Sequence, residues 1–206
     1  MSRYNLFFPL IILMSSVIFS SISARAEEAD GESIASSNGL SLVTVSLSYV
    51  SWTEFVDLDD GVLADRAFAN FYGNALGIER EVFNGRKGYA IEATLMTGQA
   101  NAGGSQTIIT YQTSYQKWWG AMASARYAYR LSPQITMSVG PLALNRQLTW
   151  PDEGTGVSVK SGSQLNYGLL ADLRLRLDKE WELRQTIGTL AFKASTIWSL
   201  GVGYKF

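Results

Sequence analysis

The chain ends in Ser195 to Phe206, which reads Ser-Thr-Ile-Trp-Ser-Leu-Gly-Val-Gly-Tyr-Lys-Phe. Apolar and aromatic residues recur at every second position of this stretch, and small or charged residues stand between them. Counting back by twos, the apolar set is Phe206, Tyr204, Val202, Leu200 and Trp198. A period of two is typical of a β-strand with one apolar face and one polar face. The stretch therefore predicts a C-terminal strand that ends on an aromatic residue.

The N-terminus has the three parts of a secretory signal peptide. Arg3 supplies a positive charge, Leu6 to Phe19 form an apolar run, and Ala24-Arg25-Ala26 is a small-x-small cleavage site. The run is shorter than the roughly 20 residues that a membrane-spanning helix needs. We therefore predict a signal peptide over 1–26, Sec-type export, and a mobile periplasmic leader over 27–39 that is rich in Glu, Asp, Ser and Gly.

Composition narrows the class of protein further. The 206 residues carry 17 Lys and Arg against 18 Asp and Glu, which gives a net charge of −1 and indicates no basic surface for nucleic acid. There is no cysteine, which excludes disulfides, thiolate metal sites and a lipid-modified cysteine. Residues 40–206 are enough for one domain.

Seven further segments alternate in the same way as the C-terminal strand. They are 42–52, 70–82, 89–96, 118–131, 165–177 and two segments that begin at Ile135 and Trp181. The segment 70–82 alternates least clearly, but Asn84-Gly85 follows it, and this pair is a strong hairpin signal. The fold class predicted is all-β, an eight-stranded antiparallel up-and-down transmembrane β-barrel, whose even strand number places both termini on the periplasmic side.

The connections are predicted to alternate between long outer loops and short inner turns. The long loops are 53–69, 97–105 and 150–163, and the short turns lie at Ser132-Pro133 and 178–180. A bulge is predicted at Gly140-Pro141, because proline cannot donate to a β-ladder and the apolar residues change parity afterwards, to Leu142 and Leu144.

A soluble lipocalin-like barrel is the competing fold, since it also has eight strands behind a signal peptide. Two features favour the membrane barrel. The polar face holds too many charges for a hydrophobic core, and aromatic residues lie near strand ends, as in an interfacial girdle. These aromatics are Tyr89, Trp119, Tyr129, Trp181, Trp198, Tyr204 and Phe206.

In its signal peptide, eight alternating segments, unequal connections and aromatic C-terminus, the chain resembles the small OmpA/OmpX-type barrels of the bacterial outer membrane. The resemblance implies a location in the outer membrane, in contact with its lipid and lipopolysaccharide. It also implies that the barrel-assembly machinery recognises the last strand through Trp198, Leu200, Val202, Tyr204 and Phe206. We expect a monomer.

The polar face predicts a network of charges inside the barrel. Its members are Glu79, Glu81, Glu92, Arg126, Arg130, Asp172, Arg174, Arg176, Glu182, Arg184 and Lys205. Because side chains just fill an eight-stranded barrel, we interpret the network as a polar plug, with a gated ion or solute path as the alternative. The central layer is predicted to hold Glu92, Arg126, Asp172, Arg174 and Arg184.

Catalytic, metal and cofactor sites are not expected. The chain has no histidine, the residue that most often serves as a general base. The run Asp57-Leu58-Asp59-Asp60-Gly61 resembles a calcium loop only superficially, because the alternate spacing and the distal Glu are missing, and we interpret it as a solvated acidic loop.

The segment Gln106 to Lys117 has strand propensity and is predicted to lie outside the membrane. It is either an ordinary loop over the barrel mouth or a protruding sheet edge that binds a surface protein by strand addition. The function predicted is a small porin-like protein of the cell envelope, with a structural role or surface interactions through its outer loops. The alternative is a narrow channel or transporter for ions or small apolar molecules, as in OmpW-like barrels.

Overall fold

The computed structural model describes residues 40–59, 66–103, 115–151, 158–190 and 195–206, and these residues form strands joined by turns. The strands are β1 (Leu40–Asp59), β2 (Arg66–Asn84), β3 (Lys87–Gly103), β4 (Gln116–Arg130), β5 (Ile135–Leu148), β6 (Ser158–Val159), β7 (Gly162–Arg176), β8 (Trp181–Leu190) and β9 (Ser195–Lys205). Within these ranges no helix is long and apolar enough to span a membrane. The predicted signal peptide and leader, 1–39, lie outside the described residues.

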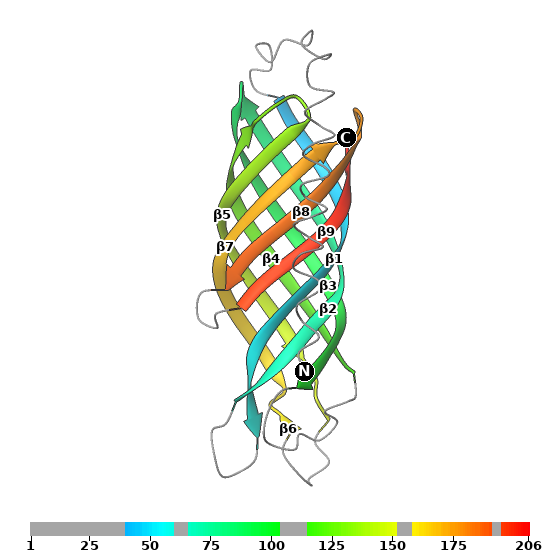
Figure 1. Ribbon diagram of the computed structural model, residues 1–206, viewed down its shortest axis with the longest axis vertical. Helices are drawn as coiled ribbons and strands as arrows, with labels where there is room; N and C mark the ends of the chain where they lie inside the picture. The colour runs from blue at the N-terminus through cyan, green and yellow to red at the C-terminus, as the bar shows by residue number, and fades with distance from the viewer. Residues whose placement is uncertain (1–39, 60–65, 104–114, 152–157, 191–194) are drawn as a thin grey trace, which may run out of the picture. The chain divides into compact units, whose positions relative to one another are not determined.

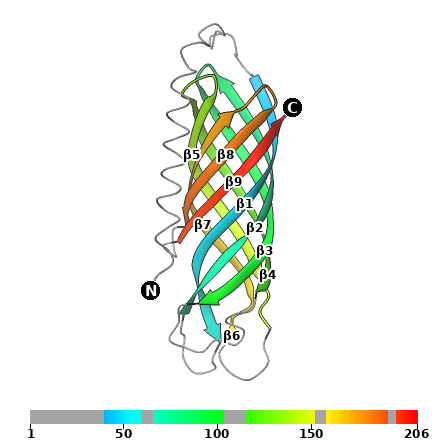
Figure 2. The same cartoon turned by 45° about the vertical axis from the view of Figure 1, so that its right-hand side comes forward.

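Eight strands close into an antiparallel barrel in the order β1-β2-β3-β4-β5-β7-β8-β9 (Figures 1 and 2). β1 closes the ring because it pairs with β2 on one side and with β9 on the other. The ladder with β9 runs from Thr44–Lys205 to Trp52–Ile197, and the amide of Phe206 extends it by donating to the carbonyl of Val43 at 2.9 Å. The predicted fold class is confirmed.

The end of the barrel that carries the three short turns also carries the start of β1 and the end of β9, and we call it the turn end. The β2–β3 turn consists of Gly85 and Arg86, with Gly85 at a φ of 63°, where glycine meets no steric penalty. In the β7–β8 turn, Asp178 Oδ1 accepts hydrogen bonds from the amides of Glu180 and Trp181 at 2.8 and 2.7 Å. These two donors hold the pKa of the Asp178 carboxyl below its usual range. The opposite end is the loop end.

Side chains alternate between the outside and the inside of the wall. The outside carries exposed large apolar residues, such as Ile91 and Leu95, which are 67% and 66% exposed. Aromatic contacts gather near the turn end, where the Tyr204 ring lies 5.1 Å from Trp181 and 5.0 Å from Phe206, centroid to centroid. An apolar belt outside charged side chains is the reverse of a soluble protein and fits a bilayer.

Three predicted loops are wrong in extent, because the strands continue beyond the apolar belt. β1 and β2 include 53–59 and 66–69, β3 includes 97–103, and β6 and the start of β7 lie within 150–163. In these extensions outward positions carry polar residues such as Thr53, Asp57 and Thr97, with Phe55 and Phe68 as exceptions, so the pattern resembles that of a loop. Asp57 and Asp59, assigned to an acidic loop, belong to β1. Most of the segment Gln106 to Lys117 falls outside the described residues, and β4 takes up its end.

The predicted bulge at Gly140-Pro141 is also wrong. The β4–β5 register is the same on both sides, with Tyr127 opposite Val139 and Ser124 opposite Leu142, so no residue is inserted. The ladder is interrupted only opposite Gly140 and Pro141, where the proline has no amide to donate. The parity therefore does not change, and Leu142 and Leu144 point inward.

β8 and β9 are shorter than the other barrel strands, and both stop short of the loop end, which is at the bottom of Figure 1. Beyond them, within the described residues, Gly162–Tyr167 of β7 pairs only with β5, and Thr53–Val56 of β1 pairs only with β2. We call the space between these two facing edges the β1–β7 gap. Near its far end β6 pairs with Leu58 and Asp59 of β1.

Deleting Phe206 should reduce insertion in cells far more than stability in detergent. In the folded barrel the residue contributes one backbone hydrogen bond and a ring contact, together worth about 1–2 kcal/mol. Its side chain is 74% exposed and is available for recognition during assembly. The fraction of folded protein in isolated membranes and refolding yields in detergent measure the two effects. Equal loss in both assays would reduce Phe206 to a packing residue.

Candidate functional site

Ionisable side chains from β2, β3, β4, β7 and β8 meet inside the barrel toward the turn end, and we call this group the charge layer. Its members are Glu79, Glu81, Glu92, Arg126, Asp172, Arg174 and Arg184, all of them buried. Each occupies an inward position of an alternating strand, so the period of two that sends leucine and tyrosine outward sends these charges inward.

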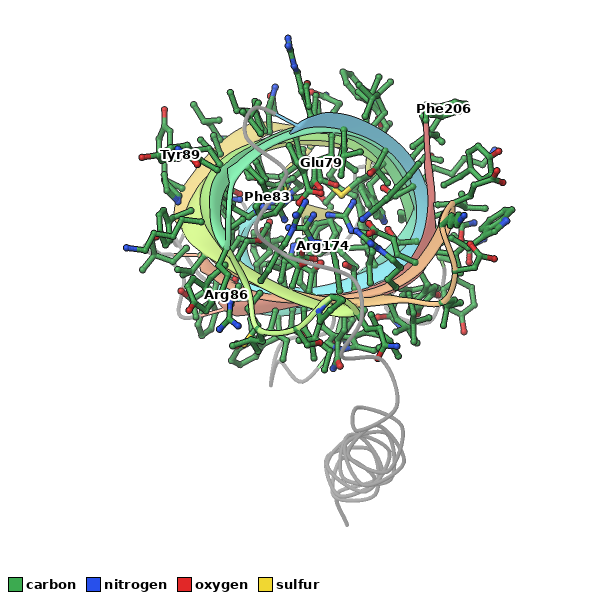
Figure 3. All side chains as sticks on the ribbon, turned by 90° about the horizontal axis from the view of Figure 1, so that it is seen from above. Glu79, Phe83, Arg86, Tyr89, Arg174 and Phe206 are labelled. Carbon is green, nitrogen blue, oxygen red and sulfur yellow. The ribbon has the colours of Figure 1, made fainter. Side chains whose placement is uncertain are left out.

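Glu79 is the centre of the charge layer. Its carboxylate contacts three guanidinium groups, those of Arg126, Arg174 at 2.7 Å and Arg184 at 3.0 Å. Figure 3, seen from the turn end, shows Glu79 and Arg174 pointing into the barrel while Tyr89 and Phe206 point away. One carboxylate on β2 therefore joins strands from around the ring.

The other two central carboxylates complete the pairing. Glu92 Oε2 lies 2.8 Å from Arg126 Nη2 and 3.2 Å from Arg184 Nη2. Asp172 Oδ2 lies 2.7 Å from Arg174 Nε, and its Oδ1 accepts a hydrogen bond from the Thr186 hydroxyl at 3.1 Å. Each of the three arginines thus contacts at least two carboxylates, which offsets the several kcal/mol that burial of each charge costs.

The remaining predicted charges lie nearer the turn end. Glu182 pairs with Lys205, with Oε2 2.6 Å from Nζ, and the guanidinium carbon of Arg130 lies 3.8 Å from the centre of the Phe83 ring. Arg176 ends β7, where it is half-buried. The structure brings together the five residues predicted for the central layer, but it puts Glu79 at their centre and adds Glu81, which contacts Arg174.

Toward the loop end the interior becomes apolar, so the polar filling predicted from the sequence is wrong for this part of the barrel. Three buried rings form an aromatic cluster there: Trp52 stacks on Phe71 with centroids 4.9 Å apart, and Trp118 meets Trp52 edge-on at 4.7 Å. Further buried residues around the cluster are Val50, Met96, Leu142, Leu144, Leu148, Leu170, Leu190 and Ile197. Burial of these apolar side chains stabilises the wall toward the loop end as it would a soluble barrel.

A pair of glycines gives Trp118 its place. Gly73 and Gly98 are partners in the β2–β3 ladder, and a Cβ on Gly98 would lie 2.0 Å from the carbonyl oxygen of Tyr72. The indole Nε1 donates to that carbonyl at 3.3 Å and to the carbonyl of Gln99 at 2.9 Å. The close approach of the two strands therefore leaves backbone acceptors within reach of the indole.

A buried cluster around Glu54, absent from the sequence prediction, bridges the β1–β7 gap. Glu54 accepts hydrogen bonds from Arg146 Nε at 2.6 Å, Trp52 Nε1 at 3.2 Å and Asn166 Nδ2 at 3.3 Å, and Arg146 also reaches Gln164 at 2.7 Å. We call it the Glu54 clasp. Val50, Trp52 and Glu54 are alternate residues of β1, so the inward face of the strand could have been extended to Glu54 from the sequence. The charges of Glu54 and Asp57 favoured a loop instead.

Between the charge layer and the aromatic cluster lies a small cavity of about 30 Å³. Glu92, Arg184, Ser199 and Met122 are among its lining residues, and its volume is enough for about one or two water molecules. Among the described residues no group of three or more His, Cys, Asp and Glu side chains is placed to hold a metal ion. The interior is thus filled by two successive layers of opposite character.

Closed antiparallel pairing, an apolar belt and an interior filled by side chains define the fold of the small eight-stranded bacterial outer-membrane barrels. Three solved structures with this fold are Ail of Yersinia pestis, OprG of Pseudomonas aeruginosa, and AlkL, determined by solid-state NMR. Each has a TM-score of 0.48, at 15%, 11% and 17% identity, and they cover 80%, 82% and 85% of this chain and 98%, 97% and 94% of their own. No protein-family model and no curated protein matches the sequence.

Replacing Glu79 with glutamine should lower the free energy of unfolding by about 3 kcal/mol, because three buried arginines lose charge compensation while the side-chain shape is kept. Urea unfolding in detergent, followed by tryptophan fluorescence, measures the change. The control is Glu180→Gln in the exposed β7–β8 turn, which should be neutral. A Glu79→Gln protein as stable as the control would show that the layer is not an ion-paired plug.

Proposed function

We propose that the protein is a non-conducting, non-catalytic barrel of the bacterial outer membrane that serves envelope structure or surface interaction. The observation that carries this proposal is the double filling of the interior, by the charge layer and by the aromatic cluster. Either layer alone blocks solute passage, and their chemistry differs, so neither an ion nor an apolar molecule meets a favourable path through both.

The turn end faces the periplasm in this proposal, and the loop end faces the medium. Short periplasmic turns and longer outer connections are the rule in such barrels, and the unequal ends of this one agree with it. The last strand, with Trp198, Leu200, Val202, Tyr204 and Phe206 on its outward side, serves as the signal for the barrel-assembly machinery.

The strand extensions beyond the apolar belt support a role at the cell surface. Outward side chains of β1 and β2 contact one another across the ladder there: Thr53 Oγ1 donates to Asn70 Oδ1 at 2.8 Å, and the rings of Phe55 and Phe68 lie 4.1 Å apart. Inside, the aromatic cluster gives the protruding wall a core of its own. A rigid stem of this kind can present outer loops to a partner away from the membrane.

In planar bilayers the refolded protein should show no unitary current steps. Arg126→Ala and Trp118→Ala each open one layer and should leave the current at baseline, because the other layer still blocks the lumen. The combined variant should conduct. Reproducible steps from the wild-type protein, altered by Arg126→Ala or Glu92→Ala, would overturn the proposal in favour of a gated ion channel.

A second candidate function, sideways passage of small apolar molecules, is favoured by the β1–β7 gap. There the apolar half of the lumen is closed by the Glu54 clasp, and within the described residues no backbone ladder spans the gap. Rearrangement of a few side chains would connect the apolar interior with the outside.

Uptake of the apolar dye N-phenylnaphthylamine by cells separates the two candidates. Under the first proposal, cells with the wild-type protein should take up the dye no faster than cells without it. Faster uptake with the wild-type protein, rising further in Glu54→Ala and unchanged in the Glu180→Gln control, would establish the second candidate.

A further inference from the structure

Arg80 is an arginine of the wall that faces outward. Arg80 lies on β2 between the outward residues Ile78 and Val82, and its ladder partners are Val43 on β1 and Ile91 on β3. It is exposed, in contrast to the buried arginines of the charge layer. A permanent charge therefore stands among aliphatic side chains on the apolar belt, where it is costly without a partner.

The chain itself satisfies only part of this guanidinium. Arg80 Nε donates to Ser41 Oγ at 3.1 Å, which fixes the orientation of the group. Within the described residues Nη1 and Nη2 have no hydrogen bond or ion pair, whereas Arg126, Arg174 and Arg184 are each paired with carboxylates. Two parallel donors are left pointing outward, the geometry that binds a phosphate or carboxylate with two hydrogen bonds.

The depth of Arg80 selects between these anions. Val82, the next outward residue toward the turn end, is the ladder partner of Tyr89, whose ring lies 5.9 Å from that of Tyr127. Aromatic pairs of this kind mark the boundary between hydrocarbon and headgroups. A long arginine side chain just inside the boundary reaches the phosphates of the neighbouring lipids.

A groove leads away from Arg80 into the apolar belt. One hollow of about 550 Å³ is lined by Arg80, Val43, Ile91 and others, and a second of about 760 Å³ adjoins it, sharing Ile78 and Ala93. Alanines make the second hollow deep, and they are Ala93, Ala121, Ala123 and Ala143. Flanked by leucines, these small residues leave a trough that a flexible acyl chain can fill.

We propose that Arg80 and this groove bind one anionic phospholipid of the periplasmic leaflet, with the phosphate on Nη1 and Nη2 and an acyl chain along Ile78 and Ala93. The proposal rests on the membrane location proposed above. In this complex the lipid phosphate pairs with the Arg80 guanidinium, and the acyl chain fills the groove beside it.

Native mass spectrometry of the refolded protein, released from detergent with dioleoyl-phosphatidylglycerol, tests the site. The wild-type protein should retain one lipid. Arg80→Gln should weaken retention about tenfold, the loss expected for charge-assisted hydrogen bonds. The control Lys179→Gln, which removes an exposed cation from the β7–β8 turn, should leave retention unchanged. Equal retention by Arg80→Gln and the wild-type protein would overturn the proposal.

The acyl groove is tested with Arg80 intact. Ala93→Phe places a ring where the two hollows meet and should reduce retention, whereas Ala171→Phe, an outward substitution on β7 across the barrel, should not. Equal retention by the two would overturn the groove assignment. Dioleoylglycerol, which lacks the phosphate, should not be retained, and inorganic phosphate should not compete. Competition by inorganic phosphate would reduce the site to a simple anion site, and a dimer that excludes lipid would assign the groove to a second copy of the chain.

A heat-dependent shift of gel mobility in detergent is recorded for each variant first. Absence of the shift in the wild-type protein would contradict the assignment as a membrane barrel, and with it the proposed function. A shifted, folded protein that retains no lipid would remove only the lipid site.

Discussion

Closure of the ring is the constraint on which the rest of the structure depends. In hydrocarbon, every backbone donor and acceptor of the wall needs a partner within the protein, so β1 must pair with β9 as well as with β2. Closure at eight strands then fixes a lumen that side chains just fill. From that point the charge layer, the aromatic cluster and the Glu54 clasp are three solutions to one problem, which is how to fill a narrow tube whose surroundings change along its length.

The change of surroundings explains why the interior changes character. Around the charge layer the apolar side chains of the wall face outward, toward lipid. The inward positions carry charged side chains such as Glu79 and Arg174, which compensate one another. Toward the loop end polar residues such as Thr53 and Asn70 join the outer face, and the inward positions carry Trp52, Phe71 and Trp118 instead. One chain thus combines the architecture of a membrane protein with that of a soluble one within single continuous strands.

The strands predicted best from the sequence are those whose two faces differ most in polarity. The alternation of Leu165 to Leu177 and of Trp198 to Phe206 gave strand identity and facing directly, because lipid demands a strict period of two. It missed the extensions, since Glu54 or Asp57 in a strand looks like a loop residue when only one kind of solvent is considered. It misread Pro141, because apolar residues at Leu142 and Leu144 look outward until an apolar interior is known. The position of Glu79 at the centre depends on the stagger between strands far apart in sequence, which local patterns do not contain.

The charge layer also bears on how the barrel reaches its native state. Glu79 comes from β2 and Arg174 from β7, which lie on opposite sides of the ring, so their contact exists only once the sheet has curled and closed. An open sheet, or a ring with a strand missing, leaves Glu79 and Arg174 without each other, and a buried charge that loses part of its pairing is costly. Pairs between neighbouring strands, such as Glu92–Arg126 and Asp172–Arg184, can form before closure. The contacts of Glu79 with Arg174 and Arg184 form only on closure, so the step that joins the last strand to the first adds their stabilisation at once. In kinetic terms, the Glu79–Arg174 contact stabilises only a ring that has closed with all its strands in place.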